Sequence, residues 1–215
     1  MKTVSITCQA ILFDLDGTLI DSRPAVERVW KAWALRHGIA WETLGPQLHG
    51  RRAIDTMRTL MPHLPQPAEA DRLTEEEIAD TDGVTAIAGA LAFLKQLPRH
   101  RWGIVTSCPL RLAEARMRAA GIPQPDVLIT ADLITRGKPD PEGFLLGAKT
   151  LGIAPENCLV FEDATAGIEA GLKAGMQVIG VATHQAAFKD VISIRDYRHF
   201  SLQTMASGLF LEVGQ

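Results

Sequence analysis

A short apolar segment that ends in two carboxylates constrains the fold of this chain most strongly. Ala10–Phe13 has the composition of a buried strand, and Asp14 and Asp16 follow where that strand should end. Gly17 then lets the backbone turn sharply. In open α/β sheets, ligands bind at the carboxyl ends of strands. Because two such carboxylates repel each other unless a cation or a shared proton intervenes, the pattern predicts a divalent-metal site holding a nucleophile or an acid/base group.

From about residue 84 the sequence alternates between strand and helix patterns. The predicted strands are Trp102–Thr106, Val127–Thr130, Cys158–Phe161 and Met176–Val181. The predicted helices are Gly89–Leu97, Leu110–Ala120, Pro141–Leu151 and Ala164–Ala174. This alternation predicts an α/β fold with a parallel sheet covered by helices on both faces. The weakly patterned C-terminal stretch is expected to add one short strand or helix within Ser201–Val213.

Residues 22–83 break this rhythm, because no convincing strand pattern occurs there. Helical spacing predicts Pro24–His37, Arg52–Leu60 and Ala68–Ala79. We therefore expect a core domain of residues 1–20 and 84–215 and a small helical domain of residues 21–83. An insert beside the acidic strand end favours a lid that excludes water, and the alternative is a packing subdomain. The acids between Glu69 and Asp82 are interpreted as a solvated face.

Composition narrows the class of protein. The 215 residues suffice for one large domain with a sizeable insert, and a net charge of −3 gives no basic field for nucleic acid. Three cysteines without a CxxC pair fit reduced thiols. The N-terminal residues lack a signal peptide, and no segment approaches the ~20 apolar residues that span a bilayer. We expect a cytoplasmic protein without nucleic-acid or membrane partners, and a monomer is favoured.

Three further motifs stand where predicted strands end. Thr106 and Ser107 follow one strand, Glu162 and Asp163 end another, and Lys138 lies in a proline-flanked loop before a helix. Taken singly, each also fits a structural role as a helix cap, a helix start or a solvated charge. In a parallel sheet, however, all of them would meet the first acidic pair at one edge.

Together these groups fit phosphoryl transfer. Asp14 and Asp163 offer hard oxygen ligands to Mg²⁺, which would screen their charge. Lys138 and Thr106 would stabilise charge on the phosphoryl group, as would Ser107 beside them. We expect Asp14 to attack phosphorus and form an aspartyl phosphate. Asp16 would protonate the leaving alcohol and then deprotonate the water that cleaves the intermediate.

The motifs resemble those of the haloacid dehalogenase superfamily over nearly the whole chain. Its four motifs are matched in order by Asp14–Ser22, Thr106, Lys138 and Glu162-Asp163. The resemblance implies a Rossmann-like core with a small helical cap inserted after the first motif. It also implies a Mg²⁺ bound by Asp14, the backbone carbonyl of Asp16 and Asp163, with Glu162 supporting the site.

Differences from sibling families narrow the reaction. Dehalogenases and phosphonatases lack an acid at the position of Asp16, and phosphonatases use a cap lysine, whereas the only lysine in the expected cap is Lys31. β-Phosphoglucomutases carry a histidine where this chain has Val26. A phosphatase is therefore preferred over a phosphosugar mutase, which remains an alternative. A receiver-like phospho-acceptor module is a second alternative, although such modules have no helical insert.

Other segments resemble sugar and hexitol phosphatases more narrowly. They are Ala25–Trp30, His49–Ile54 and Gly137–Gly147. The resemblance makes His49, Arg51 and Arg52 candidate cap residues that face the substrate. The alternative is that the arginines pair with acids on neighbouring helices. We expect a Mg²⁺-dependent phosphatase whose partner is a small phosphorylated sugar or polyol.

Overall fold

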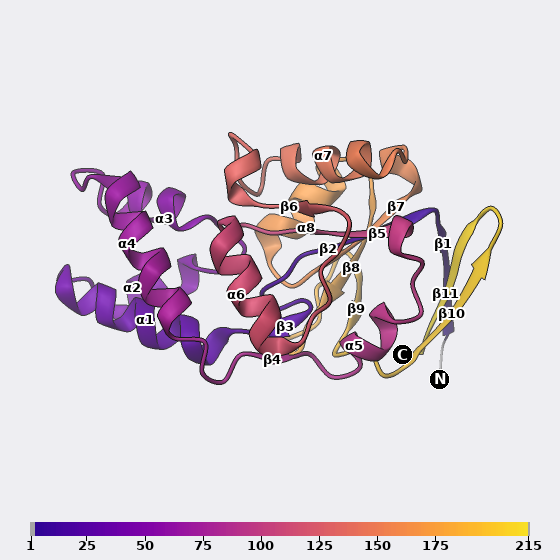
Figure 1. Ribbon diagram of the computed structural model, residues 1–215, viewed down its shortest axis with the longest axis horizontal. Coiled ribbons are helices and arrows are strands. Elements are labelled where there is room, and N and C mark those ends of the chain that lie inside the picture. The colour runs from indigo at the N-terminus through magenta and orange to yellow at the C-terminus, as the bar shows by residue number, and fades with distance from the viewer. Residues whose placement is uncertain (1–2, 215) are drawn as a thin grey trace.

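The computed structural model describes residues 3–214 and has a six-stranded parallel sheet at its centre (Figure 1). The strand order is β6-β5-β2-β7-β8-β9. The strands span Ala10–Phe13 (β2), Trp102–Val105 (β5), Leu128–Ile129 (β6), Cys158–Glu162 (β7), Gln177–Val181 (β8) and Ile192–Ile194 (β9). The acidic strand β2 therefore lies in the middle of the sheet, between β5 and β7.

Helices cover both faces of this sheet. They are α5 (Ala90–Leu94), α6 (Leu110–Ala120), α7 (Glu142–Leu151) and α8 (Thr165–Lys173). Because successive strand residues point to opposite faces, Ile11 and Phe13 pack in the core with α5 and α6, and Leu12 packs with α7 and α8. The predicted α/β class with a parallel sheet is confirmed. Short 3₁₀ turns span Gly45–Gln47, Arg99–Arg101, Ala131–Leu133 and Pro155–Asn157.

Four helices lie between β3 (Ile20–Asp21) and β4 (Thr85–Ala86), which pair antiparallel. We call this segment the helical insert. Its helices are α1 (Arg23–Arg36), α2 (Trp41–Leu44), α3 (Ala53–Leu60) and α4 (Gln66–Ala79). They enclose an apolar cluster of their own, centred on Trp33, Met57 and Leu73. Figure 1 shows the insert at one end of the molecule, beside α6. The short α2 was not predicted, because four residues leave little periodicity.

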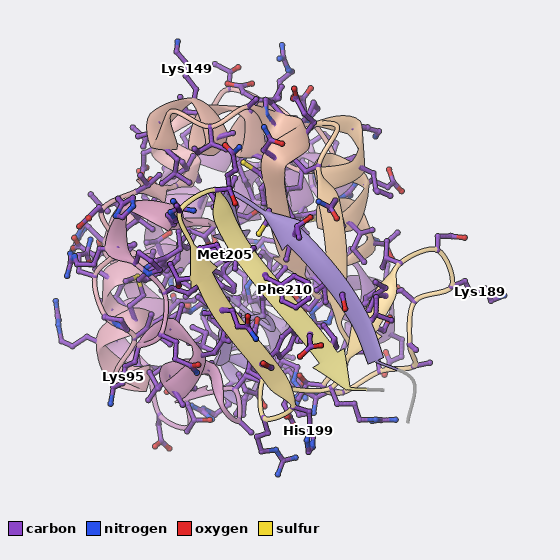
Figure 2. The ribbon with its side chains drawn as sticks, turned by 90° about the vertical axis from the view of Figure 1, so that its right-hand side faces the viewer. Lys95, Lys149, Lys189, His199, Met205 and Phe210 are labelled. Carbon is purple, nitrogen blue, oxygen red and sulfur yellow. The ribbon has the colours of Figure 1, made fainter. Side chains whose placement is uncertain are left out.

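A second, antiparallel sheet lies at the other end of the molecule (Figure 2). It has the order β1-β11-β10 and consists of Thr3–Cys8 (β1), Gly208–Gly214 (β11) and Phe200–Met205 (β10). One short strand or helix was expected within Ser201–Val213. The structure instead has a hairpin of two strands there, β10 and β11, and β11 also pairs with β1. These strands bury mainly one face, so their sequences lack the continuous apolar run that marks the central strands.

No helix among residues 3–214 combines the length and the apolarity that a membrane crossing requires. The three cysteines, Cys8, Cys108 and Cys158, are all free and buried.

Candidate active site

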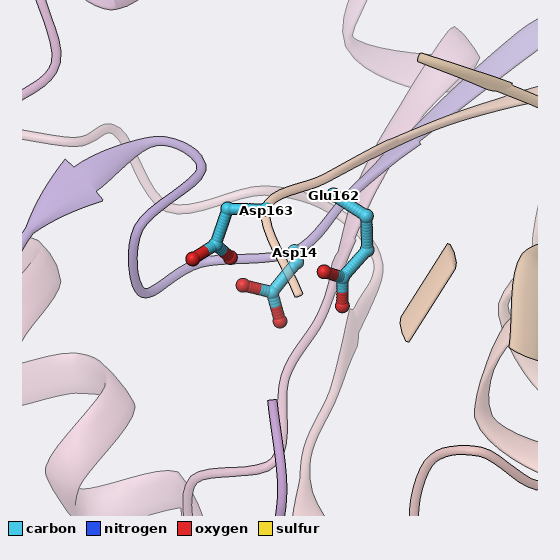
Figure 3. Close-up of side chains that lie close together, drawn as sticks. All are labelled: Asp14, Glu162 and Asp163. Atoms are coloured by element: carbon cyan, nitrogen blue, oxygen red, sulfur yellow. The ribbon is translucent and has the colours of Figure 1, made fainter. Parts of the chain in front are cut away.

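Three carboxylates meet where β2 and β7 end. The strands pair in parallel with Phe13 opposite Phe161, so the residues that follow emerge at the same edge. One oxygen from each of Asp14, Glu162 and Asp163 lies within 4.8 Å of the others. Figure 3 shows the three side chains pointing into a common space. The convergence that the parallel-sheet model predicts for these acids is therefore present.

Two glycines permit this close approach. Gly17 has φ +85°, and a Cβ there would lie 2.0 Å from Oδ2 of Asp163. A Cβ on Gly167, at the start of α8, would lie 1.6 Å from Oε1 of Glu162. Real Cβ atoms cannot approach oxygens so closely, so both positions require glycine for the acids to keep their places.

Lys138 contacts two of the acids at once. Its Nζ lies 2.5 Å from Oδ1 of Asp14 and 2.7 Å from Oε1 of Glu162, and it donates to the Val105 carbonyl at 3.2 Å. The side chain is buried, with 7% of the residue exposed. Burial alone would lower the pKa of Lys138, but Asp14 and Glu162 raise it overall. The lysine therefore stays charged.

The acids carry more negative charge than one lysine neutralises. Burial, together with the neighbouring Glu162, raises the pKa of Asp14 to about 7 against the opposing effect of Lys138. Burial, followed by the charges of Glu162 and Asp14, raises the pKa of Asp163 well above its usual value. A divalent cation would relieve this repulsion, and carboxylate oxygens are the ligands that Mg²⁺ prefers. The residues present therefore fit such a cation.

The acids differ in how free their oxygens are. Both oxygens of Glu162 are engaged, Oε1 by Lys138 and Oε2 by the Ala164 N–H at 2.7 Å. Asp163 accepts only from the Thr18 hydroxyl, at 3.2 Å, among the hydrogen bonds of the described side chains. Asp163 therefore keeps an oxygen free of side-chain and backbone partners among the described residues, whereas both oxygens of Glu162 are used within the protein.

Thr106 and Ser107 follow β5 at the same edge of the sheet. The buried Thr106 hydroxyl accepts a hydrogen bond from the Cys108 N–H at 3.1 Å, which leaves its own proton to donate. Ser107 Oγ instead donates to the carbonyl of Gly50, in the helical insert, at 3.0 Å. Ser107 is thereby engaged in joining the insert to the core.

The carboxylate of Asp16 is held by two core side chains. Arg116 Nη1 lies 3.0 Å from Oδ1 of Asp16, and Cys108 Sγ lies 3.0 Å from Oδ2. Arg116 Nη2 also lies 2.8 Å from Oε1 of Glu77, in the insert. Sequence reasoning missed Arg116, and its interpretation of the charge-rich stretch as a solvated face was wrong for Glu77, which is 6% exposed. Each charge interrupts the buried face of its helix, and that interruption was the available signal.

A cavity of about 440 Å³ opens between the insert and the core. Asp163, His49 and Arg51 are among its lining residues, and a smaller adjoining hollow reaches Asp14 and Asp16. Burial, followed by the nearby charge of Arg23, lowers the pKa of His49, which keeps its imidazole neutral.

Arg52 does not accompany Arg51 into this cavity. Its Nε lies 2.6 Å from Oδ2 of Asp55, and its Nη1 donates to the Ile134 carbonyl at 3.3 Å. The expectation that Arg52 faces the substrate does not fit this geometry, and the alternative of pairing with an acid does. Spacing could not separate the two arginines, because loop side chains cannot be aimed from sequence.

An ion-paired cluster of Asp21, Arg23 and His184 was not predicted, and Arg23 and His184 line the cavity. Asp21 receives two hydrogen bonds at 3.0 Å from Arg23, and Nε2 of His184 lies 2.9 Å from its Oδ2. Although burial opposes it, the contact with Arg23 lowers the pKa of Asp21 overall. The group joins the start of the insert to the loop after β8.

Comparison with known proteins agrees with this architecture. A family model described as haloacid dehalogenase-like hydrolase matches residues 8–175. The chain belongs to this family, as its motifs predicted, and the expectation of a hydrolase is confirmed.

Similar proteins include several phosphatases. The chain is 48% identical to hexitol phosphatase A of Escherichia coli over 179 residues, which cover 81% of this chain and 83% of the relative. It is 34% identical to glycerol-1-phosphate phosphohydrolase 2 of Saccharomyces cerevisiae, over 85% of this chain and 78% of the relative. The fold also matches a β-phosphoglucomutase from Clostridium difficile with a TM-score of 0.78, over 88% of this chain and 92% of that one, at 23% identity.

Proposed function

We propose that this protein is a Mg²⁺-dependent phosphatase of small sugar or polyol phosphates that works through an aspartyl phosphate. The observation that carries the proposal is the convergence of Asp14, Asp163 and Lys138 beside a cavity large enough for such a substrate. The family match and the phosphatases among the relatives support the assignment as a phosphoric monoester hydrolase.

Asp14 would attack phosphorus, since it belongs to the acidic cluster and lines the hollow that adjoins the cavity. Asp16, which lines the same hollow, would give its proton to the leaving alcohol and take one from the water that cleaves the intermediate. Asp14, Asp163 and the backbone carbonyl of Asp16 would hold Mg²⁺, with Glu162 in support. When bound, the cation would neutralise charge on the phosphoryl oxygens.

Lys138 and Thr106 would bind the phosphoryl group as its negative charge redistributes. Lys138 is fixed against Asp14 before substrate arrives, so little reorganisation is needed during reaction. Ser107 was expected to share this role, but its hydroxyl is occupied by Gly50. We therefore assign phosphate binding mainly to Lys138 and Thr106.

The helical insert would act as a cap over the cavity. We keep the predicted division into a core of residues 1–20 and 84–215 and a cap of residues 21–83. His49 and Arg51 line the cavity and would contact the sugar or polyol, whereas Arg52 is left out of this role. The cytoplasmic location, the monomeric state and the absence of nucleic-acid and membrane partners remain predictions from the sequence.

Phosphate release from a panel of hexose, hexitol, glycerol and nucleotide phosphates tests this function. We expect Mg²⁺-dependent turnover of sugar or polyol phosphates, lost in EDTA and in Asp14→Asn. Asp126→Asn, which alters an exposed partner of Arg99, is the matched control. Full activity of the chelated enzyme, or no release from any phosphomonoester, would contradict the proposal.

A mutase is the second candidate, because its fold is shared. Val26 lines the smaller hollow that reaches Asp14 and Asp16, and it offers no group for proton transfer, which favours a phosphatase. Incubation with glucose 1-phosphate separates the two: a phosphatase releases glucose and phosphate, and a mutase yields glucose 6-phosphate. Membership in a hydrolase family stands against the receiver-like alternative.

A further inference from the structure

Arg116 is a buried cation that joins the helical insert to the catalytic edge of the core. It lies on α6 and is only 4% exposed. One side of its guanidinium meets Asp16 at 3.0 Å, and the other meets Glu77, on α4, at 2.8 Å. Figure 1 shows α4 and α6 next to each other at the junction of insert and core.

The three charges depend on one another. A buried charge is costly unless it is paired and hydrogen-bonded. Burial raises the pKa of Glu77, while Arg116 opposes that rise. Burial alone would lower the pKa of Arg116, but Asp16 and the other neighbouring acidic groups raise it overall. Arg116 therefore stays charged and is shared between one acid of the core and one of the insert.

The pairing decides where the Asp16 carboxylate points. Arg116 holds Oδ1, Cys108 holds Oδ2, and the side chain of Asp16 is 24% exposed toward the cavity. Asp16, Glu77 and Arg116 all line the hollow that contains Asp14. Arg116 contacts Asp16 through Nη1 alone, and the same Nη1 lies 3.1 Å from Cys108 Sγ, so Arg116 and Cys108 together fix the direction of the carboxylate.

We propose that Arg116 is a positioning residue for Asp16 and that Glu77 holds Arg116 in place. The Asp16 carboxylate then points toward the substrate only while the helical insert is packed against the core. The proposal rests on the proposed function of Asp16. In the first step, a bond forms from Asp14 to phosphorus, the phosphorus–oxygen bond to the substrate breaks, and the Asp16 proton moves to the departing oxygen. In the second, water attacks phosphorus, the bond to Asp14 breaks, and a water proton returns to Asp16.

A comparison of leaving groups tests the proposal. An alkoxide needs a proton in order to leave, whereas p-nitrophenolate does not. The ratio kcat/KM reports the steps up to departure of the leaving group, so it isolates the donation by Asp16. We expect Glu77→Gln and Arg116→Lys to lower kcat/KM for glucitol 6-phosphate by about tenfold or more, a part of the 10²–10⁴ that a general acid contributes. The value for p-nitrophenyl phosphate should change by less than about twofold, because that leaving group needs no proton.

Glu75→Gln is the matched control. Glu75 also lies on α4 and pairs with Arg111 of α6, but this pair is on the surface. The Glu75→Gln substitution should leave kcat/KM unchanged for both glucitol 6-phosphate and p-nitrophenyl phosphate. In an Asp16→Asn background, which already lacks the proton donor, Glu77→Gln should produce no further loss of kcat/KM with glucitol 6-phosphate.

Three results would overturn the proposal. One is an equal loss with both probes in Glu77→Gln and Arg116→Lys, which indicates a purely structural role. Another is the same leaving-group split in Glu75→Gln. The third is a fully active Arg116→Lys together with a fully active Glu77→Gln. If the wild-type protein releases phosphate from no phosphomonoester of the substrate panel, the proposed function itself fails, so the two failures are distinguishable.

Discussion

Nζ of Lys138 lies 2.5 Å from Oδ1 of Asp14, although 124 positions separate the two residues in the chain. The contact joins the loop before α7 to the end of β2, which are brought together only by the complete sheet. Glu162 contacts the same ammonium at 2.7 Å. The folding of the core therefore assembles this charge pair before any ligand arrives.

Lys138→Met should remove both activity and stability. The change leaves two buried carboxylates without their cation, which costs about 3–5 kcal/mol. It also removes a charge that would stabilise the phosphoryl group, so kcat should fall about 10²–10³-fold. Urea unfolding and phosphate release would measure the two effects. Lys149→Met, on the exposed side of α7 (Figure 2), should change neither. An active Lys138→Met enzyme would rule out this role.

The metal-free protein should lose stability as the pH rises from about 4 toward neutrality. The pKa of Asp14 is about 7 in the folded state and 3.8 as an ordinary value. The folded protein thus holds a proton that the unfolded chain gives up, so this stabilisation declines between about pH 4 and pH 7. Thermal unfolding in EDTA should show Tm falling across this window.

Asp14→Asn should flatten that decline, because an amide does not ionise. Mg²⁺ should raise Tm more at pH 8 than at pH 5, since it binds the ionised carboxylates. A profile in EDTA that rises over the same window would contradict the raised pKa of Asp14.

Arg51 and Arg52 should separate substrate binding from stability. Arg51→Gln alters a cavity-lining charge and should raise KM about tenfold, or ~1.4 kcal/mol, with little change in Tm. Arg52→Gln breaks the pair with Asp55 and should cost about 1 kcal/mol of unfolding free energy with KM unchanged. Steady-state kinetics and urea unfolding on both variants check this. Reversed effects would place Arg52, not Arg51, at the substrate.

Gly17→Ala should abolish metal-dependent activity. The new methyl group would displace Asp163 and would occupy a backbone conformation with φ +85°. Gly121→Ala is the control, because φ there is +70° but nothing lies within 4 Å of the new Cβ. It should cost about 1 kcal/mol of stability and no activity. Mg²⁺ titrations of activity would distinguish the variants. Ordinary Mg²⁺ dependence in Gly17→Ala would show that Asp163 can move without loss.

The convergence of Asp14 with Asp163 could be predicted because it follows from two short-range signals. Each acid ends an apolar strand, and parallel strands end at one edge. Lys138 was predictable in the same way, from its loop before a helix. These inferences need only the element type and the direction of the chain, which hydrophobic periodicity supplies.

Arg116 and Glu77 could not be predicted to meet, because their pairing depends on how the insert sits against the core. That geometry is set by packing between helices whose relative placement leaves no local pattern. The same reason explains why the sequence could not tell that Arg51 lines the cavity whereas Arg52 pairs with Asp55. The β1-β11 pairing was missed because its partners are half-buried strands from opposite ends of the chain.

The pairing of Thr3 with Gly214 has a practical consequence. Both ends of the described chain leave the molecule on the side away from the helical insert (Figure 1). An affinity tag or a surface tether fused at either end would therefore leave the entrance of the cavity unobstructed. Deleting β11 would instead remove the strand with which both β1 and β10 pair. The protein should therefore tolerate attachment at its C-terminal end but not removal of β11.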